Sequence, residues 1–224
     1  MTAIVASPDW YKGITILLEV FAMLVAWGVV YAGVHAFRVT KERKHLYFAI
    51  AFGLIAVSFA GRLFTATTVA LEDFNHQIVI PSANAVGIGD NLFSLGHLSY
   101  VWLMLAAYAI LLGLAMKWQR KREFGVVLAL VTVIATTSIS VSWPFYMASL
   151  ALLFCVALQH YFNFKERRAK SAYWIFFAFA LLTIEPLLYL LSGFLPGLIA
   201  AAYLVRLIAY LTILRTLWKV FSDG

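Results

Sequence analysis

The sequence has 224 residues, of which 64% are hydrophobic and 12% are charged, and its mean hydropathy is +0.91. A soluble domain averages about 45–50% apolar and about 25% charged residues, so this chain lacks the polar surface that a soluble fold needs. The net charge is +7 and there is one cysteine, which excludes an internal disulfide. The composition therefore excludes a soluble enzyme and predicts an all-α, multi-pass integral protein of the cell membrane.

Seven apolar stretches come close to the length of about 20 residues that a membrane-spanning helix requires. They cover residues 13–37, 46–71, 91–116, 124–141, 144–164, 171–194 and 197–220. We expect one transmembrane domain of seven helices over residues 1–224, with short connections. The longest connection on the side without basic runs, residues 72–90, is predicted to be a loop partly folded over the mouth of the bundle.

Basic residues occur in every second connection. Four follow the first span, four the third, four the fifth, and two lie near the end of the seventh: Arg38, Lys41, Arg43 and Lys44; Lys117, Arg120, Lys121 and Arg122; Lys165, Arg167, Arg168 and Lys170; Arg215 and Lys219. Basic connections stay in the cytoplasm, which predicts a cytoplasmic C-terminus and an N-terminus outside. The positive charge is therefore interpreted as a topology signal and not as a nucleic-acid-binding surface.

The connection after the first span is similar to the connection after the fifth. Residues 37–43 read FRVTKER and residues 161–167 read YFNFKER. The pair predicts two parallel repeat units, 13–116 and 144–220, joined by a connector helix at 124–141. This 3+1+3 arrangement resembles that of SWEET-type sugar carriers and, more distantly, of microbial rhodopsins. The alternative is that basic connections followed by apolar spans resemble one another by composition alone.

The residues that would name either family are missing from the chain. There is no Pro-Gln dipeptide, and no lysine lies in the middle of a predicted span, since Lys219 sits at the cytoplasmic end of the last one. A retinal Schiff base of the rhodopsin type is therefore excluded. The sequence identifies no other cofactor.

Five ionisable side chains lie well inside the predicted spans: Glu19, Arg62, His97, Glu185 and Arg206. A charged side chain at mid-bilayer costs roughly 2.5–3.5 kcal/mol even on a lenient scale, so these groups must face one another or water. Counted from the outer end of each span, all five lie at a similar depth. We therefore expect Glu19 or Glu185 to contact Arg62 or Arg206 directly.

Hydroxyl side chains share helical faces with these charges at spacings of three, four or seven residues. They are Thr15; Ser58 and Thr65; Ser94; Tyr189 and Ser192; Tyr203 and Tyr210; and, in the fourth span, Thr132, Thr136, Thr137, Ser138 and Ser140. We expect these groups to converge on an outward-opening cavity. The predicted ligand- or ion-binding residues are Glu19, Arg62, His97, Glu185, Arg206, Tyr189, Tyr203 and Tyr210.

A proline follows the carboxylate of the sixth span. Pro186 removes a backbone hydrogen bond and frees the carbonyl of Leu182. A proline inside a membrane span is often no more than a tolerated kink. Next to Glu185 it also supplies a hinge beside a protonatable group, which is the combination that a proton-coupled transporter needs.

Three other interpretations of these residues stay open. Two buried ion pairs could serve only to hold helices together. Glu19, His97 and Glu185 form a chemically acceptable set for zinc or manganese, although two nearby arginines would repel a cation. His35 and His160, near the cytoplasmic ends of the first and fifth spans, could ligate a haem.

The leading functional hypothesis is a transporter or channel-like carrier of a small polar or anionic solute or ion, with proton coupling through a glutamate. The alternatives are a seven-helix receptor or a membrane subunit of a larger complex, and an intramembrane enzyme in which His97 acts with a glutamate. The expected partners are the lipid bilayer, a small polar solute or ion, and either a second copy or a partner membrane subunit.

Overall fold

The computed structural model describes residues 9–78, 86–117, 121–138, 142–195 and 197–222. These residues form seven α-helices and no strand: α1 (Asp9–Thr40), α2 (Arg43–Ile78), α3 (Val86–Ala115), α4 (Lys121–Thr137), α5 (Trp143–Arg167), α6 (Lys170–Leu191) and α7 (Leu198–Ser222). The all-helical prediction is confirmed. Each of the seven apolar stretches overlaps with one of these helices.

Six of the helices in the described residues are long and apolar enough to cross a membrane. The exception is α4, whose 17 residues extend over about 26 Å, against about 30 Å for the hydrocarbon core of a bilayer. The six long helices fit a membrane protein. The fourth predicted span is a helix, but a shorter one.

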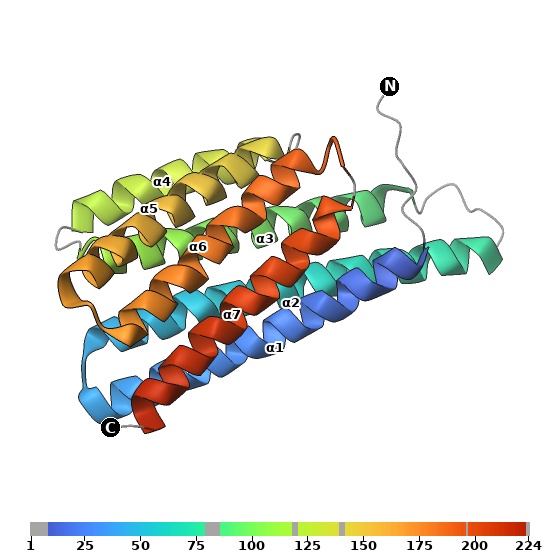
Figure 1. The fold of residues 1–224 in the computed structure, drawn as a ribbon. Coiled ribbons are helices and arrows are strands. Elements are labelled where there is room, and N and C mark those ends of the chain that lie inside the picture. Colours follow the sequence, from blue (N-terminus) through green and yellow to red (C-terminus); the bar gives the residue numbers. More distant parts are fainter. Residues whose placement is uncertain (1–8, 79–85, 118–120, 139–141, 196, 223–224) are drawn as a thin grey trace.

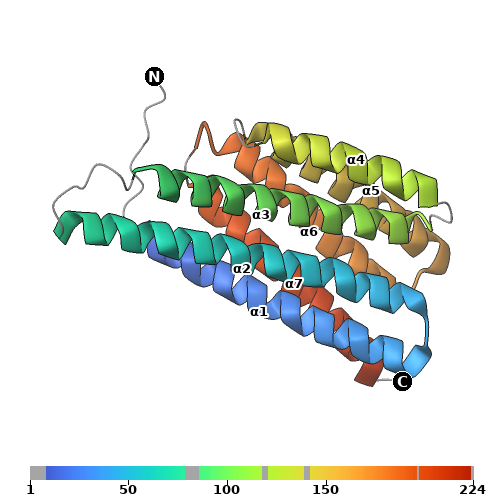
Figure 2. The same cartoon turned by 180° about the vertical axis from the view of Figure 1, so that it is seen from behind.

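The helices form a ring in which sequence neighbours lie side by side (Figures 1 and 2). On one side α1 packs against α2 and α2 against α3, and on the other α5 packs against α6 and α6 against α7. Contacts of α1 with α7 and of α3 with α5 close the ring, while α4 lies outside it against α3 and α5. The arrangement gives α1, α2, α3, α6 and α7 a common interior.

The interior is packed with alanine, aromatic and aliphatic side chains, and many other large apolar side chains face outward. Ala26, Ala51 and Phe52 are fully buried, whereas Leu17 and Leu24 are more than half exposed. A soluble protein rarely exposes contiguous apolar surface on this scale. Exposed aliphatic helices around a packed centre are the surface that a lipid environment requires.

The predicted outer loop at residues 72–90 is largely wrong. α2 remains helical to Ile78 and α3 already begins at Val86, so only residues 79–85 lie outside the described part of this segment. The acidic residues after position 71 end the apolar span but not the helix, because no proline occurs before Pro81. Both helices are therefore longer than their apolar portions.

The described basic connections meet at one end of the bundle. The α1–α2 and α5–α6 connections lie at this end together with the C-terminal end of α7, and the N-terminal end of α1 lies at the opposite end (Figure 1). Three of the exposed basic residues at this end are Lys41, Arg168 and Lys219. The antiparallel succession of helices thus collects on one side the charges that the sequence distributes over several connections.

Candidate functional site

A buried ion pair joins α6 to α7. The Arg206 Nε donates to Glu185 Oε1 at 2.7 Å, and the Nη2 of the same guanidinium contacts the same oxygen. Glu185 is 4% exposed and Arg206 is 2% exposed, so this pair is sealed inside the ring. α6 continues as one helix past Pro186, which is buried beside Glu185.

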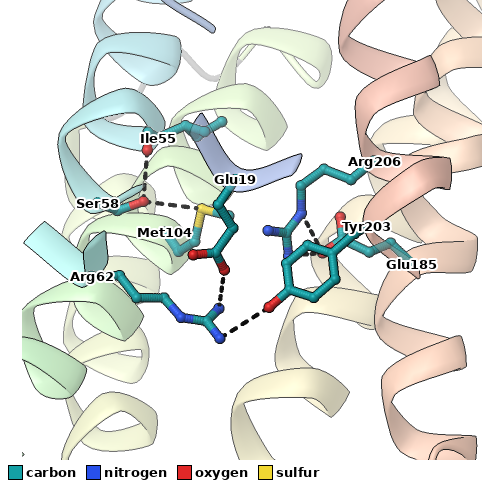
Figure 3. Close-up of polar contacts among 8 residues, drawn as sticks. All are labelled: Glu19, Ile55, Ser58, Arg62, Met104, Glu185, Tyr203 and Arg206. Carbon is teal, nitrogen blue, oxygen red and sulfur yellow. Dashed lines mark hydrogen bonds and ion pairs between the residues drawn. The ribbon is translucent and has the colours of Figure 1, made fainter. Parts of the chain in front are cut away.

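A second ion pair joins α1 to α2. The Arg62 Nη1 lies 3.0 Å from Glu19 Oε1 (Figure 3). The Glu19 side chain is 5% exposed, but the Arg62 side chain is 37% exposed. The two pairs therefore differ in access, because one arginine reaches the surface and the other does not.

Tyr203 connects the two pairs. Its hydroxyl accepts a hydrogen bond from Arg62 Nη2 at 3.1 Å, and the Cζ of Arg206 lies 5.4 Å from the centre of its ring. Figure 3 shows Tyr203 between the guanidinium groups of the two arginines. One side chain of α7 thus contacts both cations of the site.

Aromatic rings surround the buried guanidinium. The Arg206 Cζ lies 5.0 Å from the ring centre of Phe59 and 5.8 Å from that of Tyr189, and the Arg62 Cζ lies 5.0 Å from that of Tyr100. Each of these rings can stabilise a cation by its negative face. The aromatic rings therefore help the arginines to stay charged in an apolar interior.

The Glu185–Arg206 pair, which we call the inner pair, has two polar atoms without a hydrogen bond in the part of the chain that the structure describes. Among the described residues, no group hydrogen-bonds Glu185 Oε2 or Arg206 Nη1, although both atoms are buried. An unmade hydrogen bond at a buried polar atom costs about 1–3 kcal/mol. The inner pair therefore has one acceptor atom and one donor atom that could still form a hydrogen bond.

The expected contact between a glutamate and an arginine is confirmed, and both glutamates in fact make one, but His97 lies in neither pair. His97 is half-buried on α3, its ring centre lies 6.5 Å from that of Tyr100, and it hydrogen-bonds to the backbone of Ser138. Tyr210 is buried and packs against Phe52 and Phe59. The structure thus gathers Glu19, Arg62, Glu185, Arg206, Tyr189 and Tyr203 closely and leaves His97 and Tyr210 at the edge.

The hydroxyl groups predicted to line a cavity mostly bond to their own helices. Ser58 Oγ donates to the Ile55 carbonyl and to Met104 Sδ, and Ser192 Oγ donates to the Tyr189 carbonyl. Thr15, Thr65, Ser94 and Ser140 lie outside the residues whose side chains are described. A bond to a carbonyl of the same helix can satisfy a hydroxyl, and Ser58 also contacts another helix, through Met104 of α3.

The prediction that the hydroxyl groups of the fourth span converge with the charged residues is wrong. Within the described residues, α4 packs against α3 and α5 and against none of the helices that carry the ion pairs. Thr136 and Thr137 are exposed and donate to carbonyls of α4 itself, while Thr132 accepts from Trp102 Nε1 at 3.1 Å. Ser138 is buried but donates to the Ile134 carbonyl.

The metal and haem interpretations gain no support. In the described part of the chain, no three histidine, cysteine or acidic side chains are grouped as metal ligands, so Glu19, His97 and Glu185 do not form a shared site. The ring of His160 stacks on Phe179 at 4.8 Å, and that of His35 lies 6.4 Å from the ring of Tyr31. The helices that carry these two histidines, α1 and α5, do not pack against each other.

Sequence reasoning missed Phe59 and Tyr100, which stack on the arginines. A signal was present, because Phe59 precedes Arg62 by three residues and Tyr100 follows His97 by three, so each shares a helical face with a predicted site residue. Aromatic residues on apolar faces are common in membrane helices, and this signal is weak without the three-dimensional arrangement.

Comparison with known proteins identifies no relative. No family model, no curated protein and no solved structure matches this chain. The similarity of arrangement to SWEET-type carriers and microbial rhodopsins therefore gains no support from solved structures. The interpretation of the site depends on its geometry alone.

Proposed function

We propose that this chain is a membrane carrier for a small anionic or polar solute or ion, with the two arginines as its binding groups. In the proposed mechanism Arg62, which is partly exposed, receives the anionic group first. Tyr203, which contacts both guanidinium groups, then allows the solute to pass from Arg62 to Arg206. The glutamates serve as internal counter-ions and as protonatable groups.

The observation that carries this proposal is the unused hydrogen-bonding capacity of the inner pair. If Glu185 and Arg206 served only to hold α6 against α7, a structure with fully satisfied oxygens and nitrogens would be more stable. Glu185 Oε2 and Arg206 Nη1 instead have no partner among the described residues. These two atoms are an acceptor and a donor to which a solute or a proton could bind, which is the property expected of a binding group.

The finer topology belongs to the same proposal. We take α4 as a seventh span, since its 17 residues reach the lower limit of about 17–25 for a spanning helix. The grouping of basic residues at one end of the bundle supports a cytoplasmic C-terminus and an N-terminus outside. The two terminal helices, α1 and α7, are neighbours in the ring.

The contact pattern supports the 3+1+3 repeat. A two-fold axis along the membrane normal would exchange α1 with α5, α2 with α6, and α3 with α7. It would map the α1–α7 contact onto the α5–α3 contact, and both of these contacts are present. α4, which has no counterpart, lies outside the ring as a connector would.

A second candidate is a membrane subunit or receptor in which the ion pairs are structural. The observation that favours it is that both pairs are already formed and that three of the four charged groups are almost fully buried. In that case the arginines bind only their glutamate partners, and removing a charge lowers the stability of the fold without affecting any transport. The two candidates predict different results when flux is measured.

The experiment is a flux assay on the purified protein in liposomes that contain a pH-sensitive dye. Chloride, nitrate, phosphate and acetate are supplied outside in turn, and flux is compared with that of protein-free liposomes. The carrier proposal predicts flux for at least one anion, and its loss in Arg62→Gln but not in the matched surface variant Lys165→Gln. Equal flux in wild type, in Arg62→Gln and in empty liposomes would favour the structural candidate.

A further inference from the structure

A surface groove lies between α1 and α7, towards the end of the bundle that carries the basic residues. Its volume is about 560 Å³. Gly28 and Tyr31 of α1 form one wall, and Leu211, Leu214 and Trp218 of α7 form the other. The groove is separate from the ion pairs, and the inference below does not depend on the proposed carrier function.

Gly28 of α1 lies against Leu214 of α7 where the two helices line the groove. A Cβ at position 28 would lie 3.2 Å from Leu214 Cδ2, so the helices are in close contact at this point and a larger side chain would displace Leu214. Leu211 is 47% exposed beside it. The floor and walls are thus apolar and face outward, which suits a hydrocarbon chain.

Two cations are placed at one end of this apolar groove. Arg215 and Lys219 are four residues apart on α7, so they lie one turn apart on the same face, and both are exposed. None of the described residues that line the groove is acidic. Glu42, in the connection that follows α1, is already paired with Lys44 and lies 3.6 Å from the ring of His45.

We propose that this groove binds a phospholipid with an anionic headgroup. An acyl chain lies along Gly28 and Leu214, and the phosphate is held by Arg215 and Lys219. Basic pockets between helices at the membrane surface are suited to anionic headgroups. Trp218, which is 62% exposed at the same level, has the amphipathic ring typical of the interface between hydrocarbon and headgroups.

The shape of the charge distribution favours a lipid over a protein partner. A helix of another membrane protein would present an apolar face along the whole groove and would leave two cations unneutralised at its end. A phospholipid matches this distribution, because its acyl chain can lie along the apolar lining and its anionic headgroup can contact the two cations. The groove also opens on the outside of the ring, where lipid is the surrounding solvent.

The test is lipid binding to the purified, delipidated protein, measured by native mass spectrometry. Dioleoylphosphatidylglycerol, dioleoylphosphatidylcholine and glycerol 3-phosphate are titrated in turn. Wild type is compared with the double variant Arg215→Gln/Lys219→Gln and with Lys165→Gln/Lys170→Gln, which removes the same charge from the same end of the bundle. All four positions are exposed, so neither variant disturbs the packed interior.

We expect wild type to retain phosphatidylglycerol in preference to phosphatidylcholine. Loss of two cations at the surface should weaken that binding by about 30-fold in the groove variant, and much less in the control variant. Equal retention of both lipids, or an equal loss in the two variants, would overturn the proposal. Binding of glycerol 3-phosphate as tight as that of the whole lipid would also overturn it, since the site would then recognise a free phosphate.

Discussion

The two ion pairs of the interior differ in the access of their arginines. Arg206 is enclosed by aromatic rings and by Glu185, whereas the Arg62 side chain is 37% exposed. A partly exposed guanidinium can exchange its carboxylate for a solute at little cost, since water remains available to it. A buried guanidinium needs a replacement charge at the moment its own partner leaves.

The residue scale allows a direct test of which glutamate serves which arginine. Arg206→Glu places two carboxylates together in the interior and should abolish most of the folded yield, because an uncompensated buried charge costs about 3–5 kcal/mol. Adding Glu185→Arg restores opposite charges and should recover part of that yield. Adding Glu19→Arg should not, because Glu19 contacts Arg62. Folded yield is measured as the monodisperse fraction in size-exclusion chromatography, and equal rescue by both partners would contradict the assigned pairing.

The need for pairing was predictable from the sequence, but the choice of partner was not. Four charges at similar depth must neutralise one another, which follows from the cost of a charge in lipid. Which glutamate faces which arginine depends on the order of helices around the ring, and apolar periodicity does not encode that order. The same limit explains why Tyr100 was missed although it stacks on Arg62.

Among the helices, α1 and α2 lie close together at Gly33. A Cβ at this position would lie 3.0 Å from Ala49 Cβ and 3.3 Å from the carbonyl oxygen of His45. Because the second neighbour is backbone, the helices themselves would have to separate. Small residues at such crossings let membrane helices pack by van der Waals contact.

Gly33→Ala should therefore lower the free energy of unfolding of the detergent-solubilised protein by about 1–3 kcal/mol, the usual cost of overpacking, and its melting temperature should fall accordingly. Gly53→Ala is the matched control on α2, because the nearest atom to its Cβ, Val30 Cγ2, would be 3.9 Å away. Thermal unfolding of both variants is followed by light scattering or intrinsic fluorescence. A smaller loss in Gly33→Ala than in Gly53→Ala would show that the crossing is looser than described.

Element type was easier to predict than element orientation. The apolar stretches predicted every helix, since about 20 apolar residues admit no other structure in lipid. The polar residues of α4 were misleading because a threonine can bond to its own helix and then face any environment, as Thr136 does through the Val133 carbonyl. A polar stripe alone therefore does not show which face points inward.

At the scale of the whole molecule, the proposed orientation can be tested by accessibility. In a Cys155→Ala background, a cysteine at position 42 should resist a membrane-impermeant thiol reagent added to intact cells, because Glu42 lies in a basic connection. A cysteine at position 195, which is 63% exposed in the α6–α7 connection, should be labelled. Both should react after the cells are broken. Labelling of position 42 in intact cells would contradict the proposed orientation and would place the basic connections outside.

If the intramembrane charges serve transport and not only packing, Glu185→Gln should separate the two roles. The amide keeps the size of the carboxylate and most of its hydrogen bonds but cannot titrate. Melting temperature and anion flux into liposomes at several pH values are measured on one preparation, with Glu166→Gln as an exposed control. We expect a folded protein whose flux is lost or no longer depends on pH. A strongly destabilised protein with unaltered flux per folded molecule would show instead that Glu185 serves packing alone.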